Sequence, residues 1–268
     1  TALNDAVLKS GGNITSSNAL LAGHDMTVNA AGAVDNQGKV QADNDIAVDA
    51  GGDISSHDMN AVNDVMLTSG GNIVSSHALL AGRDIALNAT GNIDNQKKIQ
   101  ADQDLNIDAG GDVSSHDMLA IRDLSLKSGG DVTTNNTLLA GNDIKLNATG
   151  SVDNQGKVKA DNNLTVDAGG NISSQEMTAI NDVALKSGGN ITSNNALLAG
   201  HDMTVNAADA VDNQGKVQAD NDITVDADGN INSQDMTALN DVVLKSGGDV
   251  TTNNTLLAGN DIKLNATG

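Results

Sequence analysis

Apolar residues recur along this chain with a period of about 20 residues. The phrase NDxxLxSGGxxxxxxxLLAG begins at Asn4 and returns every 59 residues, at Asn63, Arg122, Asn181 and Asn240. Each 59-residue repeat divides into three similar segments, here called coils, of 20, 20 and 19 residues, which gives thirteen full coils and a partial one. Self-similarity at a fixed period is typical of architectures in which each repeat packs on its neighbours.

We number the sites of a coil from the first residue of this phrase. Sites 3, 5, 11, 17 and 19 are apolar in every coil, allowing one deletion before site 17 in the 19-residue coils; in the fifth coil they are Ile85, Leu87, Ile93, Ile99 and Ala101. Sites 3 and 5, and again 17 and 19, alternate with polar neighbours, which is the period of a strand with one buried face. Gly occupies site 9 in thirteen of fourteen coils, with Asp209 as the exception. It predicts a turn where a side chain would clash or φ must be positive.

These patterns predict an all-β fold, a right-handed parallel β-helix (solenoid) of about thirteen coils, each with three short strands joined by turns. Stacking places like sites over one another, so that aliphatic ladders fill the interior of a tube. The one-residue deletion is predicted to lie in a turn, because inside a strand it would flip every later side chain. Thirteen coils at about 4.8 Å predict a rod of roughly 60–65 Å. Residues 1–268 are expected to form a single β-helical repeat array, a fragment of a longer filament.

Composition narrows the range of functions. The chain has no aromatic residue, which indicates a thin core of small and branched aliphatic side chains. It has no Cys, so disulfides and thiolate metal sites are excluded. The formal net charge is −21, which argues against binding to nucleic acid or anionic membranes, since phosphate binding needs clustered cations. No apolar run is long enough to span a bilayer, so no membrane insertion is expected.

Two polar rows are candidates for chemistry. Site 2 is Asp in every coil but one, from Asp5, Asp25 and Asp45 onward, and Asn163 is the exception. Stacked carboxylates about 4.8 Å apart repel by about 1 kcal/mol in water-like surroundings. We expect these side chains to accept backbone N–H groups at the turn. Bridging Ca²⁺ is the alternative, although the calcium-binding nonapeptide G-G-x-G-x-D is not present. Site 13 is always Ser, Thr or Asn and is predicted to form an inward, hydrogen-bonded polar ladder.

The other candidate residues are predicted to be structural. The five histidines lie on turns at unlike sites, and equivalent sites elsewhere hold Gln or Asn, so no metal ligand is expected among His24, His57, His77, His116 and His201. Arg83 and Arg122 have no distinctive carboxylate cluster beside them. Met at site 17 of each third coil, such as Met59, is interpreted as core filling. No Ser–His–Asp signature or phosphate-binding loop occurs. We therefore predict that the chain is not an enzyme, binds no cofactor and has no catalytic, cofactor-binding or metal-binding residue.

A recurring sequence motif is LLAGxDxxxNAxGxxDNQGKVxAxxDLxxxAGGDI. This motif resembles the haemagglutinin repeats of filamentous haemagglutinin and related two-partner-secreted bacterial exoproteins. Those exoproteins include the long effectors of contact-dependent growth inhibition. The resemblance covers essentially the whole chain and rests on Ala81–Leu105 and its homologous copies. It implies a β-helical filament secreted through an outer-membrane partner to the cell surface or medium, with adhesive or toxic activity, and so a role in virulence, in other segments. The chain departs from the family by having no aromatics, and the family's amino-terminal secretion domain has no counterpart here.

Three functions follow for comparison. The leading hypothesis is a structural shaft that projects a binding or toxin module, whose receptor on a host cell or neighbouring bacterium would be contacted by other segments. The alternative is an adhesin segment that binds host glycan or protein through many weak contacts on its repeated outer face. A polysaccharide lyase or hydrolase is disfavoured, because such an enzyme needs a unique cluster of carboxylates with a basic residue.

Overall fold

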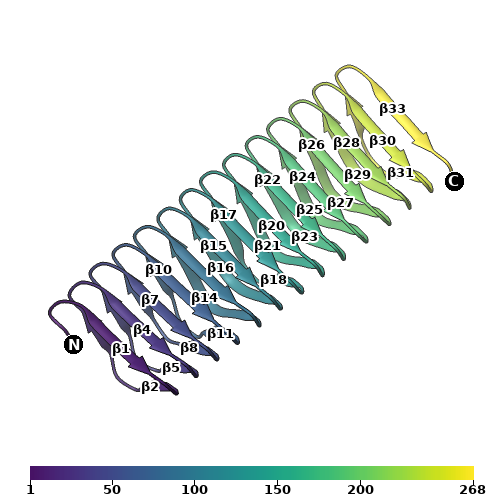
Figure 1. Ribbon diagram of the computed structural model, residues 1–268. Helices are drawn as coiled ribbons and strands as arrows, with labels where there is room; N and C mark the ends of the chain where they lie inside the picture. Colours follow the sequence, from purple (N-terminus) through teal and green to yellow (C-terminus); the bar gives the residue numbers. More distant parts are fainter. The chain divides into compact units, whose positions relative to one another are not determined.

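The computed structural model describes residues 1–268 and contains thirty-three β-strands and no helix. Paired strands are parallel, and successive coils stack on one another, so the fold is the predicted all-β parallel β-solenoid (Figure 1). No helix is long and apolar enough to cross a membrane. The chain divides into two compact units, Thr1–Gly130 and Asp131–Gly268. That residues 1–268 form one array stays a prediction.

The first unit contains two parallel sheets. Its first sheet is formed by the strands at sites 3–7: β1 (Ala6–Ser10), β4 (Met26–Ala30), β7 (Ile46–Ala50), β10 (Val65–Ser69), β13 (Ile85–Ala89), β15 (Leu105–Ala109) and β17 (Leu124–Ser128). Its second sheet is formed by the strands at sites 11–19: β2 (Ile14–Ser16), β3 (Leu20–Ala22), β5 (Val34–Asn36), β6 (Val40–Ala42), β8 (Ile54–Ser56), β9 (Met59–Ala61), β11 (Ile73–Ser75), β12 (Leu79–Ala81), β14 (Ile93–Ala101) and β16 (Val113–Ala120).

The second unit repeats this arrangement. Its first sheet contains β20 (Ile144–Ala148), β22 (Leu164–Ala168), β24 (Val183–Ser187), β26 (Met203–Ala207), β28 (Ile223–Ala227), β30 (Val242–Ser246) and β33 (Ile262–Ala266). Its second sheet contains β18 (Val132–Thr134), β19 (Thr137–Ala140), β21 (Val152–Ala160), β23 (Ile172–Ala179), β25 (Ile191–Ala199), β27 (Val211–Ala219), β29 (Ile231–Ala238), β31 (Val250–Thr252) and β32 (Leu256–Ala258).

The core is formed by the sites that the sequence assigns to it. In the first unit Ile93 pairs with Ile73 on one side and Val113 on the other, and all three are buried. Sites 3, 5, 17 and 19 are likewise buried in every coil from the second to the twelfth. The inward register is therefore confirmed, because an aliphatic residue stacks on its equivalent in the next coil. Site 7, to which the sequence assigned no role, also points inward and is either Ala or Ser, as at Ala89 and Ser128.

The second and third strands of a coil are not always separate, which differs from the prediction of three short strands. They merge into one strand of eight or nine residues in several coils, such as β14 and β16. Between Asn95 and Lys98 the pairing of β14 with β16 shifts register, since Asn95 faces Ser115 and Lys98 faces Asp117. In this coil the one-residue deletion is thus absorbed by a bulge-like irregularity within β16. In the third coil it lies outside the strands, as predicted, in the bend between β8 and β9. A bulge rotates the strand locally, so the buried sites on both sides keep facing inward.

The glycine at site 9 is required by a close approach of neighbouring coils and not by an unusual backbone conformation. No glycine in the chain has a positive φ. A Cβ atom on Gly111 would lie 2.0 Å from Asn92 Oδ1, and this oxygen accepts the N–H of Asp112 at 2.8 Å. Of the two reasons that the sequence offered for this glycine, the steric clash applies. At the exception, Asp209, the equivalent bond from the Ala210 N–H to Asn190 Oδ1 is kept at 3.0 Å.

Candidate functional site

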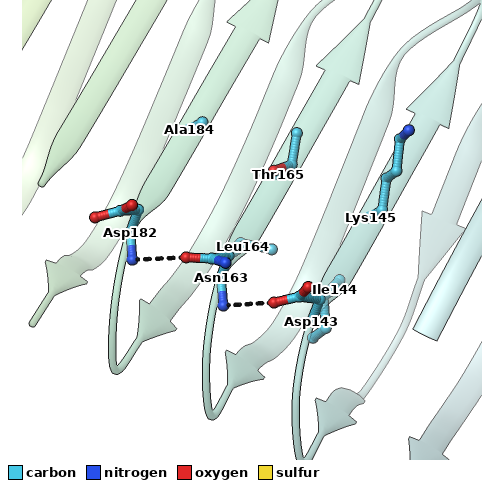
Figure 2. A pocket seen from close by; sticks show the side chains of 8 residues that line it. All are labelled: Asp143, Ile144, Lys145, Asn163, Leu164, Thr165, Asp182 and Ala184. Carbon is cyan, nitrogen blue, oxygen red and sulfur yellow. Dashed lines mark hydrogen bonds between the residues drawn. The ribbon is translucent and has the colours of Figure 1, made fainter. Parts of the chain in front are cut away.

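The site-2 residues form a row along the edge of each unit, immediately before the strands of the first sheet. We name this row the carboxylate ladder. Within each unit, Oδ1 of every ladder residue except the last accepts the backbone N–H of the site-2 residue in the next coil at 2.9–3.3 Å. Figure 2 shows three consecutive members, Asp143, Asn163 and Asp182, joined in this way. The predicted bonding of these side chains to backbone N–H groups is confirmed, and the donors belong to the adjacent coil.

A second row of side chains, at site 1, faces the carboxylate ladder. Nδ2 of Asn162 donates to Asp143 Oδ1 at 2.8 Å, and similar bonds recur from Asn221, Asn240 and Asn260. Arg122 occupies the same site and binds Asp104 through Nε and Nη2, which raises the pKa of Arg122. These donors were not predicted from the sequence, although an Asn, His or Arg stands directly before nearly every ladder residue. Repulsion between stacked carboxylates is therefore offset by backbone N–H groups and by side-chain donors.

Arg83 and Arg122 belong to this donor row. Nη2 of Arg83 lies 3.5 Å from Asp64 Oδ2, and Nη2 of Arg122 lies 2.5 Å from Asp104 Oδ2. The structure thus gives both arginines a carboxylate partner, each in the preceding coil, which the sequence alone did not identify. Because both arginine side chains are about half exposed, the ion pairs contribute little to stability.

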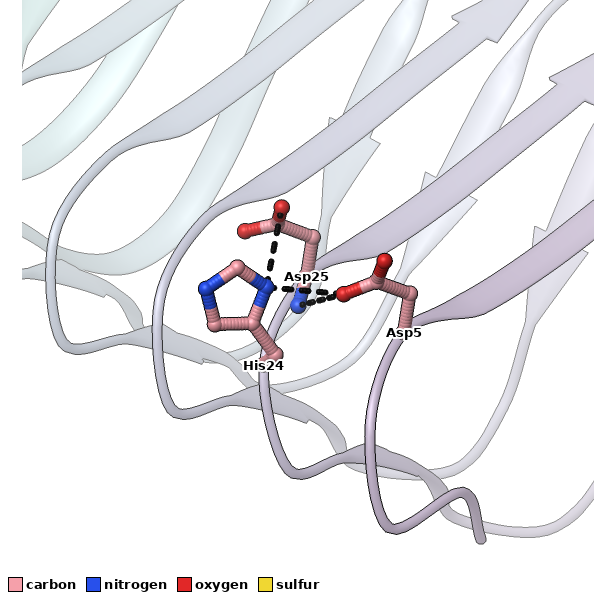
Figure 3. A group of neighbouring side chains, drawn as sticks. All are labelled: Asp5, His24 and Asp25. Carbon is pink, nitrogen blue, oxygen red and sulfur yellow. Dashed lines mark hydrogen bonds and ion pairs between the residues drawn. The ribbon is translucent and has the colours of Figure 1, made fainter.

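His24 takes the same position in the first unit and contacts two carboxylates (Figure 3). Its Nδ1 lies 2.7 Å from Asp5 Oδ1 and 3.2 Å from Asp25 Oδ2. The hydrogen bond to Asp5, followed by the charge of Asp25, raises the pKa of His24 above its usual value. The same hydrogen bond, together with the Asp25 N–H, lowers the pKa of the Asp5 carboxyl. Below the pKa of His24 the imidazolium therefore joins two adjacent coils through two ion pairs.

The second unit contains a copy of this arrangement. Nδ1 of His201 lies 3.0 Å from Asp182 Oδ1 and 3.2 Å from Asp202 Oδ2. The pKa of His201 is raised, first by the hydrogen bond to Asp182 and then by the charge of Asp202. Each trio places one imidazole nitrogen and two carboxylate oxygens within 4.8 Å of one another, which are the atoms that could hold a metal ion.

These trios were not predicted from the sequence, because the five histidines were interpreted as lying at unlike sites. His24 and His201 share site 1 and are separated by three whole repeats, which was the available signal. His57 and His116 also share a site, one repeat apart. The rings of His57 and His77 stack with their centroids 4.6 Å apart.

The site-13 residues lie inside each unit, as predicted. The asparagines at this site recur once per repeat and are buried, and Nδ2 of Asn154 donates to the Gly156 carbonyl oxygen at 2.7 Å. Nδ2 of Asn154 also lies 3.3 Å from Ser174 Oγ in the next coil. These bonds hold the segment after site 13 in place and connect neighbouring coils, which is a structural role.

The outer face of the first sheet carries a shallow depression beside the ladder in the second unit. It is lined by Asp143, Ile144, Lys145, Asn163, Leu164, Thr165, Asp182 and Ala184 (Figure 2). Lys145, Thr165 and Ala184 come from adjacent strands of the first sheet. Oδ1 of Asp143 and Oδ1 of Asn163 already accept backbone N–H groups of the next coil. These two oxygens are therefore committed to holding coils together.

A substitution in the carboxylate ladder tests its structural role. Asp45 accepts the Asp64 N–H at 3.2 Å, and Asp45→Ala should leave this N–H without its acceptor and lower the free energy of unfolding by about 1–2 kcal/mol. Asp45→Asn keeps an Oδ1 acceptor, as Asn163 does in the second unit, and should be nearly neutral. Urea unfolding of the two variants measures the difference. Equal destabilisation would mean that the charge of Asp45, and not its hydrogen bond, matters.

Comparison of the chain with protein-family models, with curated proteins and with solved structures found no match. The relationship to haemagglutinin repeats therefore stays a prediction from the repeated sequence motif.

Proposed function

We propose that the chain is a structural shaft of a secreted, filamentous bacterial surface protein, which holds a binding or toxin module away from the cell. The observation that supports this most is the regularity of the stack within each unit. Val166, for example, pairs with Leu146 on one side and Leu185 on the other, and all three are buried. Because every internal coil is bonded to two neighbours through both sheets and the ladder, such a stack resists bending and unravelling.

The cellular setting of this proposal comes from the resemblance of the repeats. Exoproteins of that class are secreted through an outer-membrane partner, so we expect the chain to be secreted and displayed outside the cell or on the outer-membrane surface. The module at the tip and its receptor, on a host cell or a neighbouring bacterium, would belong to other segments. In this proposal the chain is not an enzyme, and it contributes reach and stiffness.

One observation favours the second candidate function, an adhesin segment. A large aliphatic residue stands exposed at site 20 of the third coil in each repeat, and its side chain is 59% exposed at Val62 and 66% exposed at Leu239. Ile121 and Ile180 are the equivalent residues, and both are more than half exposed. Repeated apolar groups on an acidic surface are suited to many weak contacts with a host glycan or protein.

The shaft proposal is tested by shortening the chain by whole repeats. Deleting residues 63–121 joins Val62 to Arg122 and keeps every later residue at its site, so the variant should fold and lose three coils, about 14 Å of reach. With the chain displayed on a bacterium and an epitope at its outer end, antibody access to that epitope should fall with each repeat removed. Access that does not depend on the number of repeats would contradict the proposal.

The adhesin alternative is distinguished by a surface variant. Replacing Val62, Ile121, Ile180 and Leu239 with Thr removes the exposed aliphatic groups without touching the core. If the chain is a shaft, attachment of the purified chain to host cells should be the same weak background before and after the change. Strong attachment that the substitutions abolish would favour the adhesin.

A further inference from the structure

We propose that each compact unit carries one binding site for a divalent first-row transition-metal ion such as Zn²⁺. Three side chains form each site: Asp5, His24 and Asp25 in the first unit, and Asp182, His201 and Asp202 in the second. The inference does not depend on the proposed function, because it concerns a side-chain cluster at the edge of the stack.

The separations between the imidazole nitrogen and the two carboxylate oxygens fit such an ion. Two ligands bound at about 2.1 Å with angles between about 90° and 109° are roughly 3.0–3.4 Å apart. In the first unit Nδ1 of His24 lies 2.7 and 3.2 Å from the oxygens of Asp5 and Asp25. In the second unit the corresponding distances are 3.0 and 3.2 Å. A shift of a few tenths of an ångström in exposed side chains is enough to seat the ion.

The backbone holds the carboxylates in place before an ion binds. Asp5 Oδ1 accepts the Asp25 N–H at 3.2 Å, and in the second unit Asp182 Oδ1 accepts the Asp202 N–H at 3.0 Å. Each site therefore draws one carboxylate from one coil and the imidazole and second carboxylate from the next. In Figure 3 the Nδ1 atom of the His24 imidazole faces both carboxylates. The ion would take the place of the proton that Nδ1 shares with them.

The recurrence of the cluster is a second observation for the site. The same three residue types stand at the same sites three whole repeats apart and reach the same geometry in both units. The other repeats carry Arg83, Asn142 and Asn260 at the position of the histidine, and Arg83 and Asn260 interact with carboxylates of the ladder. None of these three side chains supplies the nitrogen ligand that an imidazole provides. Substitution by Asn at this position is thus compatible with the fold.

The donor set selects the class of ion. One imidazole nitrogen with two carboxylate oxygens suits Zn²⁺ and its first-row neighbours, whereas Ca²⁺ requires six to eight oxygens. The side chains of His24 and Asp5 are 60% and 57% exposed, so water can complete the coordination. A bound ion would join adjacent coils and offset the repulsion between their carboxylates, which is a local stabilisation of the stack.

Calorimetric titration of the metal-free full chain with ZnCl₂ at about pH 7.5 tests the proposal, since at this pH protons compete weakly for the imidazole. We expect two Zn²⁺ ions per chain. His24→Asn and His201→Asn should each remove one ion, and the double variant should bind neither. His57→Gln, which alters a histidine stacked on another histidine, is the control and should keep both ions. A parallel titration with CaCl₂ should show no binding that depends on His24 or His201.

Several outcomes would overturn the proposal. They are the absence of Zn²⁺ binding to the unaltered chain, a stoichiometry that the His24 and His201 variants leave unchanged, and the loss of an ion in the His57 control. Far-UV circular dichroism shows whether each variant keeps its strands. If His24→Asn unfolds the first unit, Asp25→Asn provides a second variant of the same metal site. It keeps an oxygen acceptor for the ladder and should weaken the binding of one Zn²⁺ ion at least tenfold.

Discussion

The substitution Ile93→Asp should unfold the coils around it before the rest of the first unit responds. Ile93 is 2% exposed and stacks between Ile73 and Val113. Removing the side chain costs about 1.5–3 kcal/mol, and burying a carboxylate with no cation within reach costs several kcal/mol more. Because each coil contacts only its neighbours, hydrogen exchange should accelerate first at residues 73–113 and later towards the ends of the unit.

The control for this prediction is Asn92→Asp, one residue earlier in the chain. Asn92 is exposed, and its Oδ1 accepts the Asp112 N–H at 2.8 Å. An Asp side chain makes the same bond elsewhere, since Asp53 accepts the Asn72 N–H at 2.7 Å. The control should therefore change exchange rates little. If both variants were equally destabilised, the inward assignment of site 11 would be wrong.

Asn154→Ala should have the second largest effect, about 2–4 kcal/mol in the free energy of unfolding. Asn154 is 1% exposed and has three side-chain bonds. Its Oδ1 accepts from Thr134 Oγ1 at 2.6 Å, and its Nδ2 donates to the Gly156 carbonyl oxygen and lies within bonding distance of Ser174 Oγ. Alanine would leave these polar groups buried without their partner and would open a cavity. Urea unfolding, with hydrogen exchange at residues 134–174, measures the loss.

Gln155→Ala is the matched control for Asn154→Ala. Gln155 is the next residue, is exposed, and donates to Asp153 Oδ2 at 3.3 Å. Its removal should change the free energy of unfolding by less than about 0.5 kcal/mol. A loss at Gln155 as large as the loss at Asn154 would show that the outward-facing side chains after site 13, and not the internal polar ladder, stabilise this region.

The contacts of the carboxylate ladder could be predicted from the sequence only in part. The regular spacing of Asp5, Asp25 and Asp45 was sufficient to predict that their oxygens accept backbone N–H groups, because stacked carboxylates repel and an Asp side chain at a turn readily accepts such groups. The partners of His24 were not predictable in the same way. Asp5 precedes it by 19 residues, and only the stacking of one coil on the next brings the two side chains to 2.7 Å. Site 1 nearly always holds a side chain that can donate a hydrogen bond, but the residue itself changes among Asn, His and Arg. Such a change of residue is easily interpreted as ordinary surface variation.

Burial shows the division between sequence and tertiary structure most directly. The segments Asp131–Gly150 and Asp249–Gly268 are identical in sequence, and two of the three strands begin at the same sites in both segments. Ile144 and Leu146 are almost completely buried in the first segment, whereas their equivalents Ile262 and Leu264 are 45% and 55% exposed. The alternation of apolar and polar residues therefore determined the strands, their inward face and their register. Whether that face is buried was decided by a following coil, because one coil has no second layer of its own to pack against.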